Sequence, residues 1–200
     1  MAAFANLAAG QAPEWLAAEM PPGYQTRLGE IQRLMADLGA MDQIGRLLWE
    51  SGEPLTEAVR DLFGALKCEV ESIADLPANQ VAVKLDGRRR LLLHVSAPDG
   101  TIQRKSDEIA EVFELLQRVA GSDDRVVLVT NADRTIHPGN RPEPLAPDAL
   151  AFVQRMGVNV VKSADLFKLW RLSHEAQDRA LAVLDRLHAQ DGGAFQPPAS

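Results

Sequence analysis

Apolar residues recur at three- and four-residue steps between residues 25 and 48, which is the pattern of an α-helix with one apolar face. The members of this stripe are Leu28, Ile31, Leu34, Met35, Leu38, Met41, Ile44, Leu47 and Leu48. An apolar face needs a covering surface, which is either the rest of the domain or a second copy of the chain. The sequence therefore predicts an amphipathic helix over 25–50 that serves association or packing.

A change of pattern follows the break at Ser51-Gly52. A helix with Pro54 in its first turn is predicted there, and strand-like runs cover part of 65–73, 80–85 and 90–96. The dipeptide Asp86-Gly87 lies between the last two runs and is a strong hairpin signal.

The second half of the chain alternates helical and strand patterns. Helices are predicted over 105–120, 147–156 and 174–189, with another that begins at Ser163. Short continuous apolar runs over 125–130 and 158–161 are typical of strands that are covered on both faces. This order predicts an α/β domain over 51–190 with a mixed sheet flanked by helices. We expect a flexible leader over 1–24 and a disordered tail over 191–200.

Composition narrows the class of protein. The chain has 200 residues, 46% of them hydrophobic, which is enough for one ordinary core. A single cysteine excludes a disulfide scaffold and a Cys-rich zinc module. No apolar run reaches the roughly 18–20 residues that span a bilayer, and no basic segment precedes an N-terminal apolar one. We expect a soluble, cytoplasmic protein with no membrane partner, and its net charge of −7 argues against a surface that binds nucleic acid throughout.

Several segments between about 47 and 172 occur in the order known from one superfamily. They are 55–70, which runs from Leu-Thr-Glu-Ala-Val to Leu-Lys-Cys-Glu-Val, the hairpin 81–96, the segment 126–131, Arg141-Pro142, and 163–167. In this order and spacing the chain resembles the restriction-endonuclease-like (PD-(D/E)XK) superfamily, in its Mrr-like and Holliday-junction-resolvase-like branch. The resemblance implies a restriction-endonuclease-like mixed β-sheet core flanked by helices, with the N-terminal amphipathic helix as an extra element.

The catalytic positions of this superfamily are degenerate in the chain. The resemblance implies an Asp at the start of the hairpin, where Gln80 or its neighbour stands, and Glu-x-Lys at the end of its second strand, where His94-Val95-Ser96 stands. Glu57 alone keeps its type, and a carboxylate in the first turn of a helix is an equally good explanation for it. Mg²⁺ prefers anionic oxygen ligands, so we predict a pseudo-nuclease with no catalytic residue, metal or cofactor.

His94 has two interpretations. It is a general base or a ligand for a softer metal, or it is a neutral, half-buried histidine that fills the former metal cavity. We favour the second, because no other histidine, cysteine or carboxylate lies at ligand spacing beside it in the sequence.

Six basic residues lie between positions 84 and 105, against the two acidic residues Asp86 and Asp99. They are Lys84, Arg88, Arg89, Arg90, Arg104 and Lys105. Such a cluster is typical of a phosphate or nucleic-acid contact. A solvated hairpin tip paired with acidic neighbours explains it as well, and we favour that interpretation slightly.

Three hypotheses for function follow. The leading one is a catalytically inactive interaction or scaffold domain that binds a protein partner, or a second copy of itself, through the 25–48 helix. The second is a metal-dependent nuclease whose site has migrated. Its candidate carboxylates and lysines are Glu57, Asp61, Glu69, Glu71, Lys84 and Lys105. The third is a nucleic-acid-binding module without chemistry that uses the basic hairpin.

Overall fold

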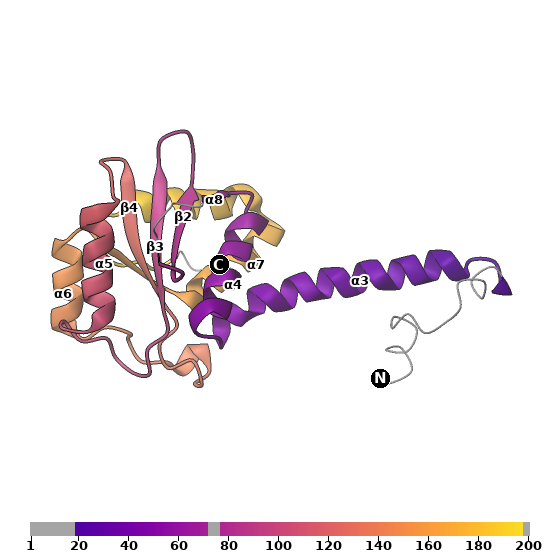
Figure 1. Ribbon diagram of the computed structural model, residues 1–200, viewed down its shortest axis with the longest axis horizontal. Coiled ribbons are helices and arrows are strands. Elements are labelled where there is room, and N and C mark those ends of the chain that lie inside the picture. Colours follow the sequence, from indigo (N-terminus) through magenta and orange to yellow (C-terminus); the bar gives the residue numbers. More distant parts are fainter. Residues whose placement is uncertain (1–18, 72–76, 198–200) are drawn as a thin grey trace. The chain divides into compact units, whose positions relative to one another are not determined.

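A mixed β-sheet of six strands lies at the centre of the second of two units into which the chain divides, residues 1–43 and 44–200 (Figure 1). The computed structural model describes residues 19–71 and 77–197. Helix α3 (Tyr24–Gly45) makes up most of the described part of the first unit. The predicted flexible leader falls largely outside the described residues, which begin at residue 19.

The strands follow one another across the sheet in the order of the sequence. They are β1 (Glu69–Glu71), β2 (Gln80–Lys84), β3 (Arg90–Ser96), β4 (Asp124–Thr130), β5 (Asn159–Lys162) and β6 (Gly193–Ala194). The pairs β1–β2 and β2–β3 are antiparallel, whereas β3–β4, β4–β5 and β5–β6 are parallel. The hairpin predicted at Asp86-Gly87 therefore joins β2 to β3, and helical crossovers join the parallel strands.

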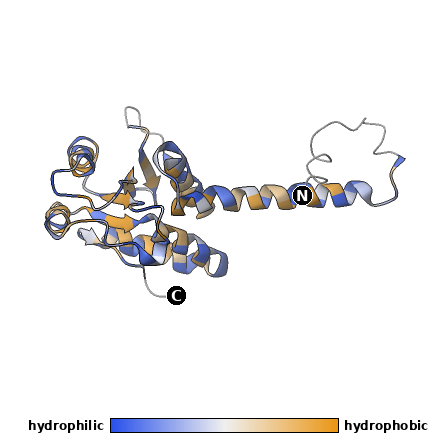
Figure 2. Ribbon diagram, turned by 90° about the horizontal axis from the view of Figure 1, so that it is seen from below, coloured by the Kyte–Doolittle hydropathy of each residue, from blue (hydrophilic) through white to orange (hydrophobic). Residues whose placement is uncertain are grey.

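Helices cover both faces of the sheet. Those of the second unit are α4 (Gly52–Ala65), α5 (Asp107–Arg118), α6 (Pro147–Arg155), α7 (Ser163–Glu175) and α8 (Gln177–Ala189), with short 3-10 turns at Arg46–Leu48 and Pro138–Asn140. One apolar core lies between the sheet and α4, α7 and α8, and the other between the sheet and α5 and α6. The strands at the centre of the domain are accordingly the most apolar segments in Figure 2. The predicted mixed α/β architecture is confirmed.

The C-terminal segment differs from the predicted disordered tail. Strand β6 pairs with β5, Phe195 donates its backbone N–H to Val160, and the Phe195 side chain is buried in the core. The buried amide of Asn159 holds the turn before β6, since its Nδ2 donates to the Leu187 carbonyl at 2.7 Å and its Oδ1 accepts from Gly192 N–H at 3.0 Å. The sequence has no apolar pattern here, because two residues of pairing are too few to produce one.

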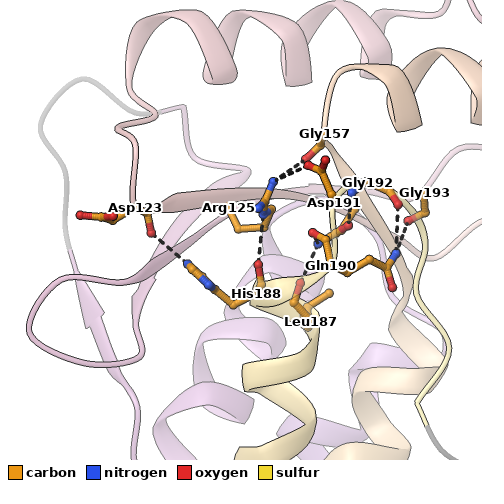
Figure 3. Close-up of polar contacts among 10 residues, drawn as sticks. Asp123, Arg125, Gly157, Leu187, His188, Gln190, Asp191, Gly192 and Gly193 are labelled. Carbon is orange, nitrogen blue, oxygen red and sulfur yellow. Dashed lines mark hydrogen bonds and ion pairs between the residues drawn. The ribbon is translucent and has the colours of Figure 1, made fainter.

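A second group of contacts holds the same end of α8 (Figure 3). Arg125, at the start of β4, donates to the His188 carbonyl at 3.1 Å and to Asp191 at 3.3 Å. Gln190 donates to the carbonyls of Gly192 and Gly193 at 3.2 Å each. These contacts fix the turn by which the chain enters β6. Among the described residues, no helix is long and apolar enough to cross a membrane.

Candidate functional site

Gln80, His94 and Ser96, which the resemblance predicts to be degenerate catalytic positions, lie on the face of the sheet that α5 covers. Gln80 of β2 is the direct cross-strand partner of His94 in β3, and Ser96 is the partner of Thr130 in β4. His94 and Ser96 are two residues apart, so their side chains share this face. Gln80 is 8% exposed, His94 1% and Thr130 2%. Gln80, His94 and Thr130 form a buried polar row on this face, and Ser96 continues the row at a partly exposed position.

Glu111 of α5 brings a carboxylate to this polar row. Its Oε2 lies 3.3 Å from His94 Nε2, outside hydrogen-bond geometry, and accepts from Asn79 Nδ2 at 3.2 Å. In the part of the chain that the structure describes, neither His94 ring nitrogen has a hydrogen-bond partner, and Thr130 Oγ1 has none either. Burial lowers the pKa of His94, against the opposing charges of Glu111 and Glu108, so the imidazole is neutral at pH 7.

Glu111 was not among the residues expected from the sequence. It lies on α5, and only the crossover from β3 to β4 places that helix over His94. The side chain of His94 is also more deeply buried than the half-buried position that we expected.

This cluster does not fit the magnesium ion that the resemblance implies. Among the described residues, Glu111 is the one carboxylate within ion-pair distance of His94, and Gln80, His94 and Ser96 add only neutral groups. Within residues 19–71 and 77–197, no three His, Cys, Asp or Glu side chains are grouped so that they could hold a metal ion. A hard divalent cation needs several anionic oxygens, and this cluster supplies a single carboxylate.

Glu57 does not join the cluster. Helix α4 packs on the opposite face of the sheet from α5, and the Glu57 carboxylate forms an ion pair with Arg60 one turn along the same helix. Arg60 also donates to the Ala78 carbonyl at 3.4 Å. No ion pair or hydrogen bond among the described residues links Glu57 to His94.

Three of the other residues considered for a migrated site form ion pairs at the edge of the sheet, namely Glu69, Glu71 and Lys84. Lys84 lies 3.4 Å from Glu69 and 3.7 Å from Glu71, and Arg90 lies 3.5 Å from Glu71. Asp61 is exposed on α4. Glu69, Glu71 and Lys84 therefore meet at the sheet edge, and no ion pair among the described residues joins them to Glu57 or Asp61 of α4.

The six basic residues of the 84–105 segment form two groups. Four belong to the β2–β3 hairpin near its turn, and Arg104 and Lys105 follow β3. The seven residues of β3 separate the groups by about 23 Å. Arg104 lies over the ring of Phe152, with its guanidinium carbon 4.9 Å from the ring centroid. The segment therefore presents no single basic patch.

Carboxylates pair with most of the cations at the hairpin tip. Arg90 binds Asp124 through two hydrogen bonds of 2.9 and 2.7 Å, and Arg89 lies 2.6 Å from Asp86 and 3.0 Å from Asp185. The backbone N–H groups of Arg89 and Arg88 and the Arg89 side chain hold the pKa of Asp86 well below its usual range. This arrangement favours the solvated, paired tip over a nucleic-acid surface.

A buried polar network lies at the carboxyl ends of β4 and β5. Asn131 Oδ1 accepts from Arg141 Nη1 at 2.6 Å and from Ser163 Oγ at 2.8 Å, and its Nδ2 donates to the Glu50 carbonyl at 2.8 Å. Arg141 also donates to the Leu48, Arg134 and Ile136 carbonyls. Three of the positions that carry the family resemblance thus join a strand end, a loop and a helix start. Their donors and acceptors are used within the fold.

A cavity of about 830 Å³ lies beside α7 and α8. The ion pairs Lys162–Glu143 and Lys168–Asp165, with N–O distances of 2.9 and 2.8 Å, line it. Arg179 and Arg186 line it from α8 and are seven residues apart, which puts them on one face of that helix. This spacing is visible in the sequence, although neither arginine was among the predicted site residues.

Comparisons with known protein families, with curated proteins and with solved structures found no match to this chain. The fold defines the chain as a mixed α/β protein with helices on both faces of its sheet.

Substituting His94 tests the charge state that we assign to it. A buried neutral histidine stabilises the fold fully above its unfolded pKa of 6.5, and this contribution is lost as the pH falls through the lower folded pKa. We expect the free energy of unfolding of the wild type to fall between pH 6.5 and 5 by up to about 1.4 kcal/mol per pH unit from this group. His94→Leu should lose that part of the slope, as measured by urea titration.

The control for this measurement is Val112→Ala, which removes buried packing of α5 in the same core without removing a titratable group. It should lower the free energy of unfolding at every pH and keep the wild-type slope. An unchanged slope in His94→Leu would show that the imidazole of His94 titrates in the folded state as it does in the unfolded chain.

Proposed function

We propose that this chain is a non-catalytic domain with a restriction-endonuclease-like core. It binds a protein partner, or a second copy of itself, through helix α3. The observation that carries the proposal is the apolar stripe of α3. Its five largest exposed members are Ile31 (40% exposed), Leu34 (54%), Met35 (54%), Leu38 (61%) and Met41 (45%). Ile44 is the one residue of α3 that is buried. Five large apolar side chains on one helix face mark an interaction surface.

The energetics of a single helix support this proposal. Gly29 and Gly39 inside α3 weaken the isolated helix by about 1 kcal/mol each relative to alanine. Most helix stability in proteins comes from packing of the apolar face. Covering a half-exposed leucine or methionine contributes about 1 kcal/mol at the usual value for buried apolar area. A protein that covers the apolar stripe would therefore gain binding free energy and stabilise α3 through the same contacts.

The chemistry of the polar row supports the absence of catalysis. Hydrolysis of a phosphodiester by a metal-activated water needs a cation held by anionic oxygens. The positions that correspond to the family's acidic residues carry an amide and a buried imidazole, and the position of its lysine carries Ser96. Glu111 supplies one negative charge, which is too few for a hard divalent cation.

A cleavage assay tests this part of the proposal. We expect the full chain to leave single-stranded, duplex and branched DNA intact in the presence of Mg²⁺ or Mn²⁺. Metal-dependent cleavage that disappears in Glu111→Gln or Glu57→Gln would contradict it. Glu114→Gln is the control on the same helix, because Glu114 lies one turn from Glu111 and pairs with Arg118 instead.

A stability measurement tests the role of the stripe. If α3 serves a partner rather than its own domain, Leu34→Gln with Leu38→Gln should change the free energy of unfolding of residues 44–200 by less than about 0.5 kcal/mol in dilute solution. Urea titration followed by the fluorescence of Trp170, which lies in the domain core, reports this quantity. A loss of several kcal/mol would show that the stripe packs on the domain itself, and the association role would then be wrong.

A further inference from the structure

The apolar stripe of α3 is symmetric about its own midpoint, which lies between Leu34 and Met35. Counted outward from this point, Ile31 matches Leu38 and Leu28 matches Met41. At 3.6 residues per turn, all six of these side chains lie within an arc of about 140° on the helix surface. The remaining positions from 25 to 43 carry polar residues, glycine or alanine. A second copy of the helix that runs in the opposite direction would therefore place an apolar residue opposite each apolar residue of the first, at the same height along the helix axis.

The charged residues within the stripe repeat this symmetry with opposite sign. Arg27 and Asp42 are equally far from the midpoint, and both lie inside the apolar arc. In the described part of the chain neither forms an ion pair, although many other charged side chains do. In an antiparallel pair of helices, Arg27 of each copy would lie level with Asp42 of the other. In a parallel pair, like charges would meet at both positions.

We infer that the partner of α3 is a second copy of this chain, bound through an antiparallel pair of α3 helices whose twofold axis passes between Leu34 and Met35. This inference rests on the proposed function and names the partner for the same surface. The interface is of the isologous kind, in which one patch is complementary to itself. The 22 residues of α3 supply about three heptads and a length of about 33 Å, so the two helices overlap over their whole length.

The geometry of such a pair follows from its axis. Ile31 faces Leu38 of the other copy, while Leu34 and Met35 each lie near their own counterparts at the centre. The two copies of Leu28 are separated by 13 helical positions, which is about 20 Å. A disulfide requires Cα atoms within about 7 Å of each other. Cysteines at 34 and at 28 therefore distinguish the two directions of pairing.

The experiment uses the full chain with Cys68→Ser, which removes its only cysteine. Under mild oxidation we expect Leu34→Cys to form a covalent dimer and Leu28→Cys to form none, although it still associates non-covalently. A mixture of Ile31→Cys and Leu38→Cys chains should form the mixed dimer in preference to either homodimer. Covalent dimers of Leu28→Cys in a yield equal to that of Leu34→Cys would indicate parallel helices and overturn the inference.

Charge exchange gives a second readout that needs no cysteine. Arg27→Asp puts two pairs of carboxylates in contact and Asp42→Arg puts two pairs of guanidinium groups in contact, so each variant alone should dimerise at least about tenfold more weakly than the wild type. Mixed together, the two variants should restore association, since each then faces a partner of opposite charge. Sedimentation at several concentrations measures this, and failure of the mixture to recover would contradict the inference.

The outcomes separate this inference from the proposed function. A wild type that stays monomeric at every concentration, with no covalent dimer of Leu34→Cys, would overturn pairing with a second copy. The association role of α3 is judged independently by the stability of the domain in Leu34→Gln with Leu38→Gln, which requires no dimer.

Discussion

Asn131→Ala is expected to lower the free energy of unfolding by about 3–5 kcal/mol, because this one buried side chain satisfies one buried and two part-buried groups. Asn131 is 1% exposed and joins the Glu50 carbonyl, the Arg141 guanidinium and the Ser163 hydroxyl. Alanine would leave the guanidinium with one acceptor fewer in a half-buried place. Urea titration of the two proteins under the same conditions measures the difference.

Two further variants define what the Asn131 measurement means. Asn140→Ala removes an exposed asparagine from the neighbouring loop and should change stability by less than about 0.5 kcal/mol. Ser163→Ala removes one hydrogen bond of the network and should cost about 1 kcal/mol. A loss of under 1 kcal/mol in Asn131→Ala would contradict the role of this residue as the centre of the network.

Gly192→Ala is expected to destabilise the domain by at least about 3 kcal/mol, since two separate effects act at this position. The residue has a φ of +80°, which is unfavourable for a side chain. An added Cβ would also lie 2.5 Å from the Gln154 carbonyl oxygen and 3.1 Å from the Cα of Gly157. All of these atoms belong to the backbone, so the turn before β6 would have to shift. Urea titration reports the loss.

Gly100→Ala is the matched control for backbone strain. Gly100 has a φ of +102°, and a Cβ there would meet no atom within 4 Å. Its substitution should therefore cost only the strain of a left-handed residue, about 1–2 kcal/mol. Equal losses of unfolding free energy in the two variants would show that the contact with Gln154 relaxes at no cost. The close packing of this turn would then contribute nothing to stability.

The burial and neutrality of the polar row support a non-catalytic function. A nuclease site combines several negative charges with access to water, whereas His94 and Gln80 are sealed beneath α5 and are neutral. Glu111 lies at the rim of this row with half of its side chain exposed. Such a cluster adds to the packing of α5 on the sheet, and it leaves α3 as the surface on which we place the function.

The sequence by itself determined the elements whose signals are local. Asp86-Gly87 fixed the hairpin, the apolar run over 125–130 gave the central strand β4, and three- and four-residue periodicity gave α3 and the helices of the domain. These signals depend on neighbours a few residues apart, which any stretch of chain carries with it. The symmetry of the α3 stripe also belongs to the sequence, since it needs only the helical period.

Tertiary structure alone decided which distant groups meet. Glu111 reaches His94 because the crossover from β3 to β4 packs α5 on the face of the sheet that carries His94. Asp124 reaches Arg90 because β3 and β4 pair in parallel register. Strand β6 forms because the Asn159 amide and Arg125 hold the turn that precedes it. In each case the residues are 17 or more positions apart in the sequence. The free energy of their contact depends on burial that only the assembled sheet and helices provide.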